Sequence, residues 1–253
     1  CTHAIAADEA DVKEIQEQFG IPTLWNVFMV PENFIREDAP PASDIAAFIG
    51  AAYFTGPAYN YPKAGNLLRN RFLADPRLEG LMNRPHFQLP ERSSTALTRF
   101  ESLHAEMRTR LLAGEVDAKG LALFAQELHH IRAELFALFL EGLRLGMACV
   151  NLPTLVKAFS GRVIEAMAAS VPSVSWLPPD RPECARLFSD GDDVLLFDTV
   201  EKLAGKIAMM RETPRIRHQL VHRARAGLRQ RHTSRIRCHQ YGRWIDAAET
   251  PCF

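Results

Sequence analysis

The regular alternation of short apolar runs with amphipathic helix patterns after residue 44 most constrains the fold. The runs "DIAAFIG", "MACVNL", "SVPSVSWL" and "DVLLF" are typical of strands that are buried on both faces of a sheet. Between them lie "KAGNLLRNRFLA", the pattern around Glu165 and "RPECARLFSDG", which are typical of helices. This order predicts an α/β fold with a doubly wound, mostly parallel, Rossmann-like sheet and ligand chemistry at the carboxyl ends of its strands.

A shorter α/β piece precedes this alternation. Two strand patterns, "THAIAAD" and "TLWNVFMV", flank "EADVKEIQEQFG", where an acidic first turn and Gly20 mark the ends of a helix. The following "PENFIREDAPPASD" is rich in Pro and acidic residues, as linkers are. We expect residues 1–36 to be the end of one domain plus a linker. Residues 37–253 then form a second domain, with a helical insertion at about residues 92–145 and helices at its C-terminus.

Composition excludes several classes of protein. The chain has 30 Lys and Arg against 30 Asp and Glu, so the whole-chain charge does not indicate a nucleic-acid partner. Its five cysteines are odd in number and form no CxxC pair, which argues against a disulfide framework and against a zinc site. We predict a cytoplasmic protein. Because the sequence opens at Cys1 without a Met or a signal pattern, we expect a fragment of a longer protein.

The C-terminal region is rich in arginine. Ten Arg lie from Arg211 to Arg243, against one acid, Glu212. Such a run is typical of a solvated helix face, and the alternative is a contact with phosphate or with the acidic inner face of a membrane. His218 and His222 have the spacing of a helical metal clamp, but no third ligand accompanies them, and we predict no metal site.

The segment "FSGRVIEAMAASVPSVSW" carries the candidate chemistry. On a helix, Arg162 and Glu165 share one face, while Ser160 and Gly161 fall at the N-terminus, where backbone N–H groups lack partners. Gly161 permits close approach of a ligand, Arg162 can bind a diphosphate, and Glu165 can accept two ribose hydroxyls. The alternative is structural: Ser160 is an N-cap, and the two charges form a surface ion pair worth less than about 1 kcal/mol.

A wider resemblance favours the binding interpretation. Residues 150–245 carry, in order, "RVIEAMAASVPSV", "PECARLFSDGDDVLLFD", "LAGKIAMMRETPRIRHQL" and "RHTSRIR". This order resembles the carboxyl-terminal, donor-binding half of GT-B fold glycosyltransferases of group 1 and of the spore-coat-protein-like type. Upstream, "DIAAFIGAAY" is similar to the strand that opens the donor domain. Residues 1–36 resemble the end of the acceptor-side Rossmann domain and the crossing linker.

The resemblance implies roles for the residues that match its motifs. It assigns the donor ribose to Glu165 and the donor diphosphate to Ser160, Gly161 and Arg162, with Arg162 as the catalytic cation that stabilises the leaving group. By the same resemblance, Gly50 lets its loop approach the donor phosphates.

One position departs from the pattern. Many group 1 members have a second Glu eight residues before the ribose-binding one, and this chain has Lys157 there. Lys157 could still bind a donor phosphate, but a mechanism that relies on the first carboxylate is in doubt.

The expected function is therefore transfer of a sugar from a nucleotide-diphosphate sugar, which is a substrate, to a glycan, lipid or protein acceptor. The expected hexosyltransferase needs neither a metal nor a cofactor, and its setting is polysaccharide or glycoconjugate biosynthesis. Two alternatives stay open. One is a catalytically silent GT-B-like nucleotide-binding or scaffold module. The other is an interaction protein that uses the helices of residues 92–145 for a partner and the Arg-rich tail for a membrane.

Overall fold

The computed structural model describes residues 2–47, 63–83, 92–153 and 159–247. Contacts divide the chain into two compact units, one formed by Cys1–Pro85 with Leu143–Phe253 and the other by His86–Gly142. The predicted domain boundaries, at residue 36 and at residues 92–145, remain predictions.

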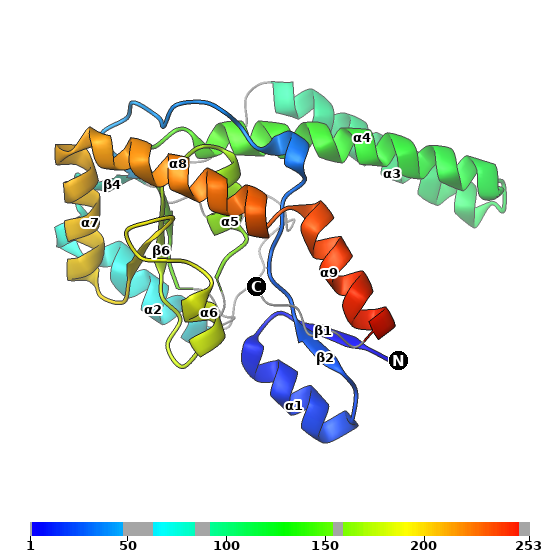
Figure 1. Ribbon diagram of the computed structural model, residues 1–253. Helices are drawn as coiled ribbons and strands as arrows, with labels where there is room; N and C mark the ends of the chain where they lie inside the picture. The colour runs from blue at the N-terminus through cyan, green and yellow to red at the C-terminus, as the bar shows by residue number, and fades with distance from the viewer. Residues whose placement is uncertain (1, 48–62, 84–91, 154–158, 248–253) are drawn as a thin grey trace. The chain divides into compact units, whose positions relative to one another are not determined.

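A five-stranded sheet with entirely parallel pairing lies at the centre of the first unit (Figure 1). Its strand order is β4-β3-β5-β6-β7. The strands are β3 (Ala46–Ala47), β4 (Met82–Asn83), β5 (Cys149–Asn151), β6 (Ser173–Trp176) and β7 (Leu195–Phe197). The predicted parallel α/β sheet is confirmed, and β4 is an edge strand that the sequence patterns did not indicate.

Helices connect and cover these strands. They are α2 (Lys63–Ala74), α5 (Arg162–Ala168), α6 (Pro182–Arg186), α7 (Val200–Glu212), α8 (Pro214–Arg231) and α9 (Ser234–Ala247), with a 3-10 turn, η3 (Pro76–Leu78). Local chemistry sets their starts. The Thr199 hydroxyl accepts the Lys202 N–H at the start of α7, and Pro begins α6 and α8, where a missing N–H costs nothing.

The short N-terminal piece has the predicted order. It consists of β1 (Ala4–Ala6), α1 (Glu9–Phe19), β2 (Thr23–Trp25) and a 3-10 turn, η1 (Glu32–Phe34). The Asp8 carboxylate caps α1 by accepting the Ala10 N–H at 3.0 Å, and Gly20 ends it with φ of 63°. The second strand is shorter than predicted. It ends at Trp25, and Val30 instead forms an isolated parallel bridge with Thr233, just before α9.

One apolar core lies around the sheet of the first unit. Its fully buried members include Val150 on β5, Val174 on β6, and Leu203 and Ile207 on α7. Ring contacts add to it, with Phe72 and Phe197 at 5.6 Å between centroids. The predicted strands are buried because helices cover them, as expected for parallel sheets.

The second unit contains α3 (Arg92–Leu112) and most of α4 (Ala118–Leu143). Ala96, Ile131 and Leu135 form its small buried core. Among the described residues, no helix combines the length and the apolar composition that a membrane span requires.

Two glycines provide a matched test of this packing. A Cβ on Gly146, just before β5, would lie 2.6 Å from the Ala47 Cβ and 2.7 Å from its backbone nitrogen on β3. Gly205, within α7, has no neighbouring atom within 4 Å of such a Cβ.

We predict that Gly146→Ala lowers the free energy of unfolding by about 1–3 kcal/mol through overpacking. Gly205→Ala should raise it by about 0.5–1 kcal/mol, because Ala is the better helix former. Urea unfolding of both variants checks this, and a Gly146→Ala variant as stable as the wild type would contradict the described packing of β3.

Candidate functional site

The strand order of the sheet identifies where a ligand is expected. The chain runs from β3 to β4 on one side and then to β5 on the other side, so the order reverses beside β3. Open α/β sheets bind ligands beyond the carboxyl ends of their strands at such a reversal. The segments that follow β3 and β5 contain Gly50 and Lys157, and both residues lie outside the described part of the chain.

Helix α5, which follows β5, is almost entirely buried. It packs against β5, β6 and α8, and its buried residues are Val163, Ile164, Ala166, Met167 and Ala168. The remaining two, Arg162 and Glu165, are partly exposed. Because residues three apart on a helix are neighbours, these two side chains share the one face of α5 that the core does not use.

The Glu165 carboxyl is not a solvated surface group. Burial raises its pKa to about 7, and the positive charge of Arg162 only partly opposes this shift. The same two charges act on Cys149 at the start of β5, whose pKa burial raises to about 12. Glu165 is therefore a part-buried carboxyl that titrates near neutrality, unlike the carboxylate of a simple surface ion pair.

The start of α5 differs in detail from the sequence-based interpretation. Ser160 Oγ accepts the Arg162 N–H at 3.3 Å, while Gly161 is the N-cap residue, with helical φ of −50° and no side-chain cap. A Cβ on Gly161 would lie 3.2 Å from the ring of Phe28. Glycine here gives room to Phe28, and a close approach of a ligand to Gly161 remains a prediction.

A small pocket adjoins this helix start. It has an empty volume of about 280 Å³ and is lined by Trp25, Asn26, Val27, Phe28, Phe159, Ser160, Ile164, Leu187 and Phe188. Most of these side chains are apolar, and the space that a water-sized sphere could occupy is only about 10 Å³, far below the roughly 300–1,000 Å³ of small-molecule sites. We assign this pocket to packing of residues 25–28 against the loop before α5, and not to a nucleotide.

The arginines of α8 serve a role that the sequence patterns did not indicate. Five of its six Arg make hydrogen bonds or ion pairs with other segments of the first unit; they are Arg217, Arg223, Arg225, Arg229 and Arg231. Arg217 and Arg225 are largely shielded from water in these contacts, whereas the side chains of Arg223, Arg229 and Arg231 are 56%, 52% and 40% exposed, so part of this helix does present the solvated arginine face that the sequence predicts.

A buried pair, His232 and Arg237, lies at the junction of α8 and α9. Arg237 donates to His232 Nδ1 at 2.8 Å, so the neutral imidazole carries its proton on Nε2. Burial, with the charges of Arg237 and Arg231, lowers the pKa of His232 to about 3. The backbone carbonyl of His232 accepts the Val30 N–H at 3.1 Å, which ties the residue just before the linker to this end of α8.

The two shifted groups give opposite pH dependences of stability. Glu165 has a folded-state pKa above its unfolded value of 4.5. Its contribution to the free energy of unfolding is therefore present at low pH and is lost as pH rises through about 7. His232 acts in the opposite direction, because its lowered pKa costs stability as pH falls from 6.5 towards 3.

We predict that Glu165→Gln gains stability relative to the wild type by about 1–3 kcal/mol between pH 4.5 and pH 8. Urea unfolding of both proteins across this range measures the difference, in which the His232 contribution cancels. A difference that does not change with pH would show that Glu165 titrates normally.

Comparisons with known proteins agree with the fold described above. Residues 125–242 match the family model described as "Glycosyl transferase-like". No curated protein sequence matches the chain. Sucrose-phosphate synthase from Thermosynechococcus elongatus is 14% identical, with a TM-score of 0.50, over 98% of this chain and 59% of that one. Anabaena Alr3699/HepE, solved in complex with UDP-glucose, is 12% identical, with a TM-score of 0.51, over 98% of this chain and 64% of that one.

At such identities the solved structures establish the fold, and this chain spans less than two thirds of each of them. Residues 125–242 are thus similar to the glycosyl transferase-like family, and the chain has the α/β fold of these GT-B glycosyltransferases.

Proposed function

We propose that this chain is the donor-binding half of an enzyme that transfers a sugar from a nucleotide-diphosphate sugar to a glycan, lipid or protein acceptor. The observation that carries the proposal is the part-buried Glu165 carboxyl, with a pKa of about 7, on the helix that follows the strand-order reversal. A buried carboxylate needs hydrogen-bond donors, and the two hydroxyls of a ribose supply them.

The charge beside Glu165 suits the rest of the donor. Arg162 shares the open face of α5 and would bind the diphosphate. As the glycosidic bond breaks, negative charge develops on the leaving diphosphate, and a fixed guanidinium there stabilises the transition state more than the ground state. Ser160 and Gly161, at the start of the helix, and Gly50 and Lys157, in the two loops, are the further proposed contacts.

The proposal extends to the partners. HepE was solved with UDP-glucose, which makes UDP the first nucleotide to test. The acceptor would enter from the lobe of which residues 1–36 are the proposed end, so we assign no catalytic base.

We also propose a cytoplasmic location. A contact of the exposed arginines with an acidic membrane surface is the weaker proposal, since most arginines of α8 have partners within the protein.

Lys157 favours one alternative function. A positive charge in place of the first carboxylate is compatible with a module that binds a nucleotide sugar without turnover. Binding together with absent hydrolysis or transfer of the sugar would support that module over the enzyme.

The test is calorimetric titration of the chain with UDP, GDP, dTDP, CMP and ADP. We predict that one of them binds, and that Glu165→Ala weakens binding by about 1–3 kcal/mol through lost ribose hydrogen bonds. Glu212→Ala, at the exposed end of α7, is the matched control and should bind like the wild type. Equal affinity of a folded Glu165→Ala variant would remove Glu165 from the site, and binding of none of the nucleotides would contradict the proposal for this chain.

A further inference from the structure

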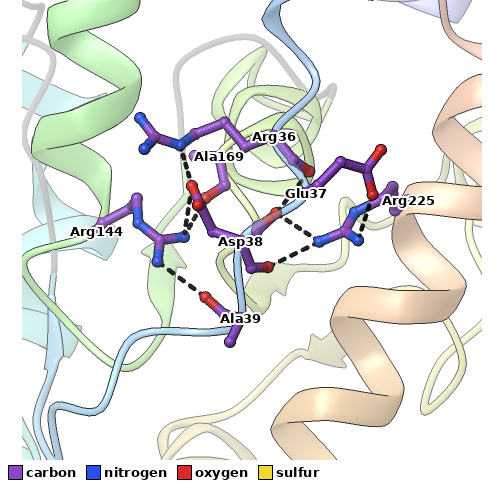
Figure 2. A network of polar contacts seen from close by, with 8 residues as sticks. Arg36, Glu37, Asp38, Ala39, Arg144, Ala169 and Arg225 are labelled. Atoms are coloured by element: carbon purple, nitrogen blue, oxygen red, sulfur yellow. Dashed lines mark hydrogen bonds and ion pairs between the residues drawn. The ribbon is translucent and has the colours of Figure 1, made fainter.

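Two arginines attach residues 36–39, which follow η1, to the C-terminal end of α5 (Figure 2). The first is Arg144, which follows α4 in the sequence. Its Nη1 donates to the carbonyl oxygen of Ala169 at 2.7 Å, and its Nη2 donates to that of Ala39 at 2.8 Å. Ala169 directly follows α5, so one guanidinium joins the linker to the end of this helix.

Arg225 of α8 makes a second bridge between the same two segments (Figure 2). Its Nη2 donates to Ser170 Oγ and to the Asp38 carbonyl oxygen, both at 2.8 Å. Its Nη1 donates to the Glu37 carboxylate at 2.8 Å. A planar guanidinium with several donors suits this geometry, whereas the single nitrogen of Lys could not reach all three acceptors.

The backbone completes the connection. The Arg36 N–H donates to the Ala168 carbonyl at 2.8 Å, and the Ser170 hydroxyl donates to the Arg36 carbonyl at 2.9 Å. The last carbonyls of any helix lack partners within the helix. In α5 the linker and Arg144 supply those partners, while Ser170 turns the chain away with a left-handed φ of 57°.

Exposure separates these two arginines from others near them. The side chains of Arg144 and Arg225 are 21% and 15% exposed, whereas that of Arg223, on the same helix as Arg225, is 56% exposed. Charged hydrogen bonds that are shielded from water are stronger than surface ion pairs. Burial also lowers the pKa of Arg144, which shows the cost of placing its charge there.

A backbone hydrogen bond connects Ala169, at the end of α5, to Glu165, the candidate ligand-binding residue. Ala169, whose carbonyl Arg144 binds, donates its own N–H to the Glu165 carbonyl at 2.9 Å. Any shift of the last turn of this seven-residue helix would therefore move Glu165.

We propose that Arg144 and Arg225 are positioning residues, which fix α5 against the linker and so hold Glu165 and Arg162 where the donor nucleotide binds. This inference rests on the proposed function. The inference goes beyond the proposed function in two ways. It assigns part of the nucleotide affinity to two residues outside the site, and it makes the linker a structural part of the donor half.

The first test compares Arg144→Gln and Arg225→Gln with the matched control Arg223→Gln, whose arginine pairs with Asp192 and does not contact α5 or the linker in the described interactions. Nucleotide affinity is measured where circular dichroism shows every variant to be folded. We expect about a 3- to 30-fold loss of affinity in the first two variants and less than about a twofold loss in the control. Equal affinities in all three variants would overturn the proposal.

The second test needs no nucleotide. Hydrogen exchange of the α5 amides is measured against those of α7 in the same unit. Release of the anchor should speed exchange in α5 selectively, including at Ala169, in Arg144→Gln and Arg225→Gln. A merely structural role would speed exchange in both helices together, and that outcome would overturn the proposal. If the wild type binds none of the nucleotides, the proposed function fails, while this exchange ratio still decides whether the arginines fix α5.

Discussion

The burial of α5 is the constraint on which the candidate site depends. A helix of seven residues has no stability of its own, so its contacts with β5, β6 and α8 must hold it in place. Those contacts use every residue of the helix except Arg162 and Glu165. The core therefore selects the face that these two side chains occupy, and partial burial of that face gives Glu165 its raised pKa. The packing of α5 and the raised pKa of Glu165 therefore have the same cause, which is the burial of this helix.

The second constraint is the distribution of charge. The chain is neutral overall, yet α8 has six Arg and no acid, and the acidic residues Glu37 and Asp38 lie in the linker. Arg225 and Arg229 both pair with Glu37, and Arg217 donates to the Ser43 carbonyl at 2.7 Å. This helix thus binds the linker along part of its length, in addition to packing on α5. The arrangement explains how two arginines of this helix, Arg217 and Arg225, can bind other segments of the same chain while Arg223 and Arg229 remain exposed.

Much of the fold could be predicted from the sequence, because buried parallel strands and amphipathic helices leave strong periodic patterns. The strand β4 could not, since Met82 and Asn83 are two residues without a pattern. The early end of β2 is a tertiary effect, as Val30 pairs with Thr233 about two hundred residues later. Spacing and resemblance made Glu165 a candidate residue, and its raised pKa depends on burial that only the structure shows. The role of Arg144 could not be predicted, because its hydrogen bonds go to the carbonyl oxygens of Ala39 and Ala169, and its ion-pair partner Asp38 lies about a hundred residues earlier in the sequence.

The most direct measurement of the central claim is the number of protons released when a nucleoside diphosphate binds. Calorimetry of UDP binding at about pH 6.5, in two buffers of different ionisation enthalpy, gives this number for the wild type and for Glu165→Gln. Glu165 is mostly protonated at that pH, and ribose hydroxyls bind its ionised form, so the wild type should release about three quarters of a proton more than the variant. Equal proton release in both proteins would show that the nucleotide does not engage Glu165, and the account of α5 as the donor-binding helix would be wrong.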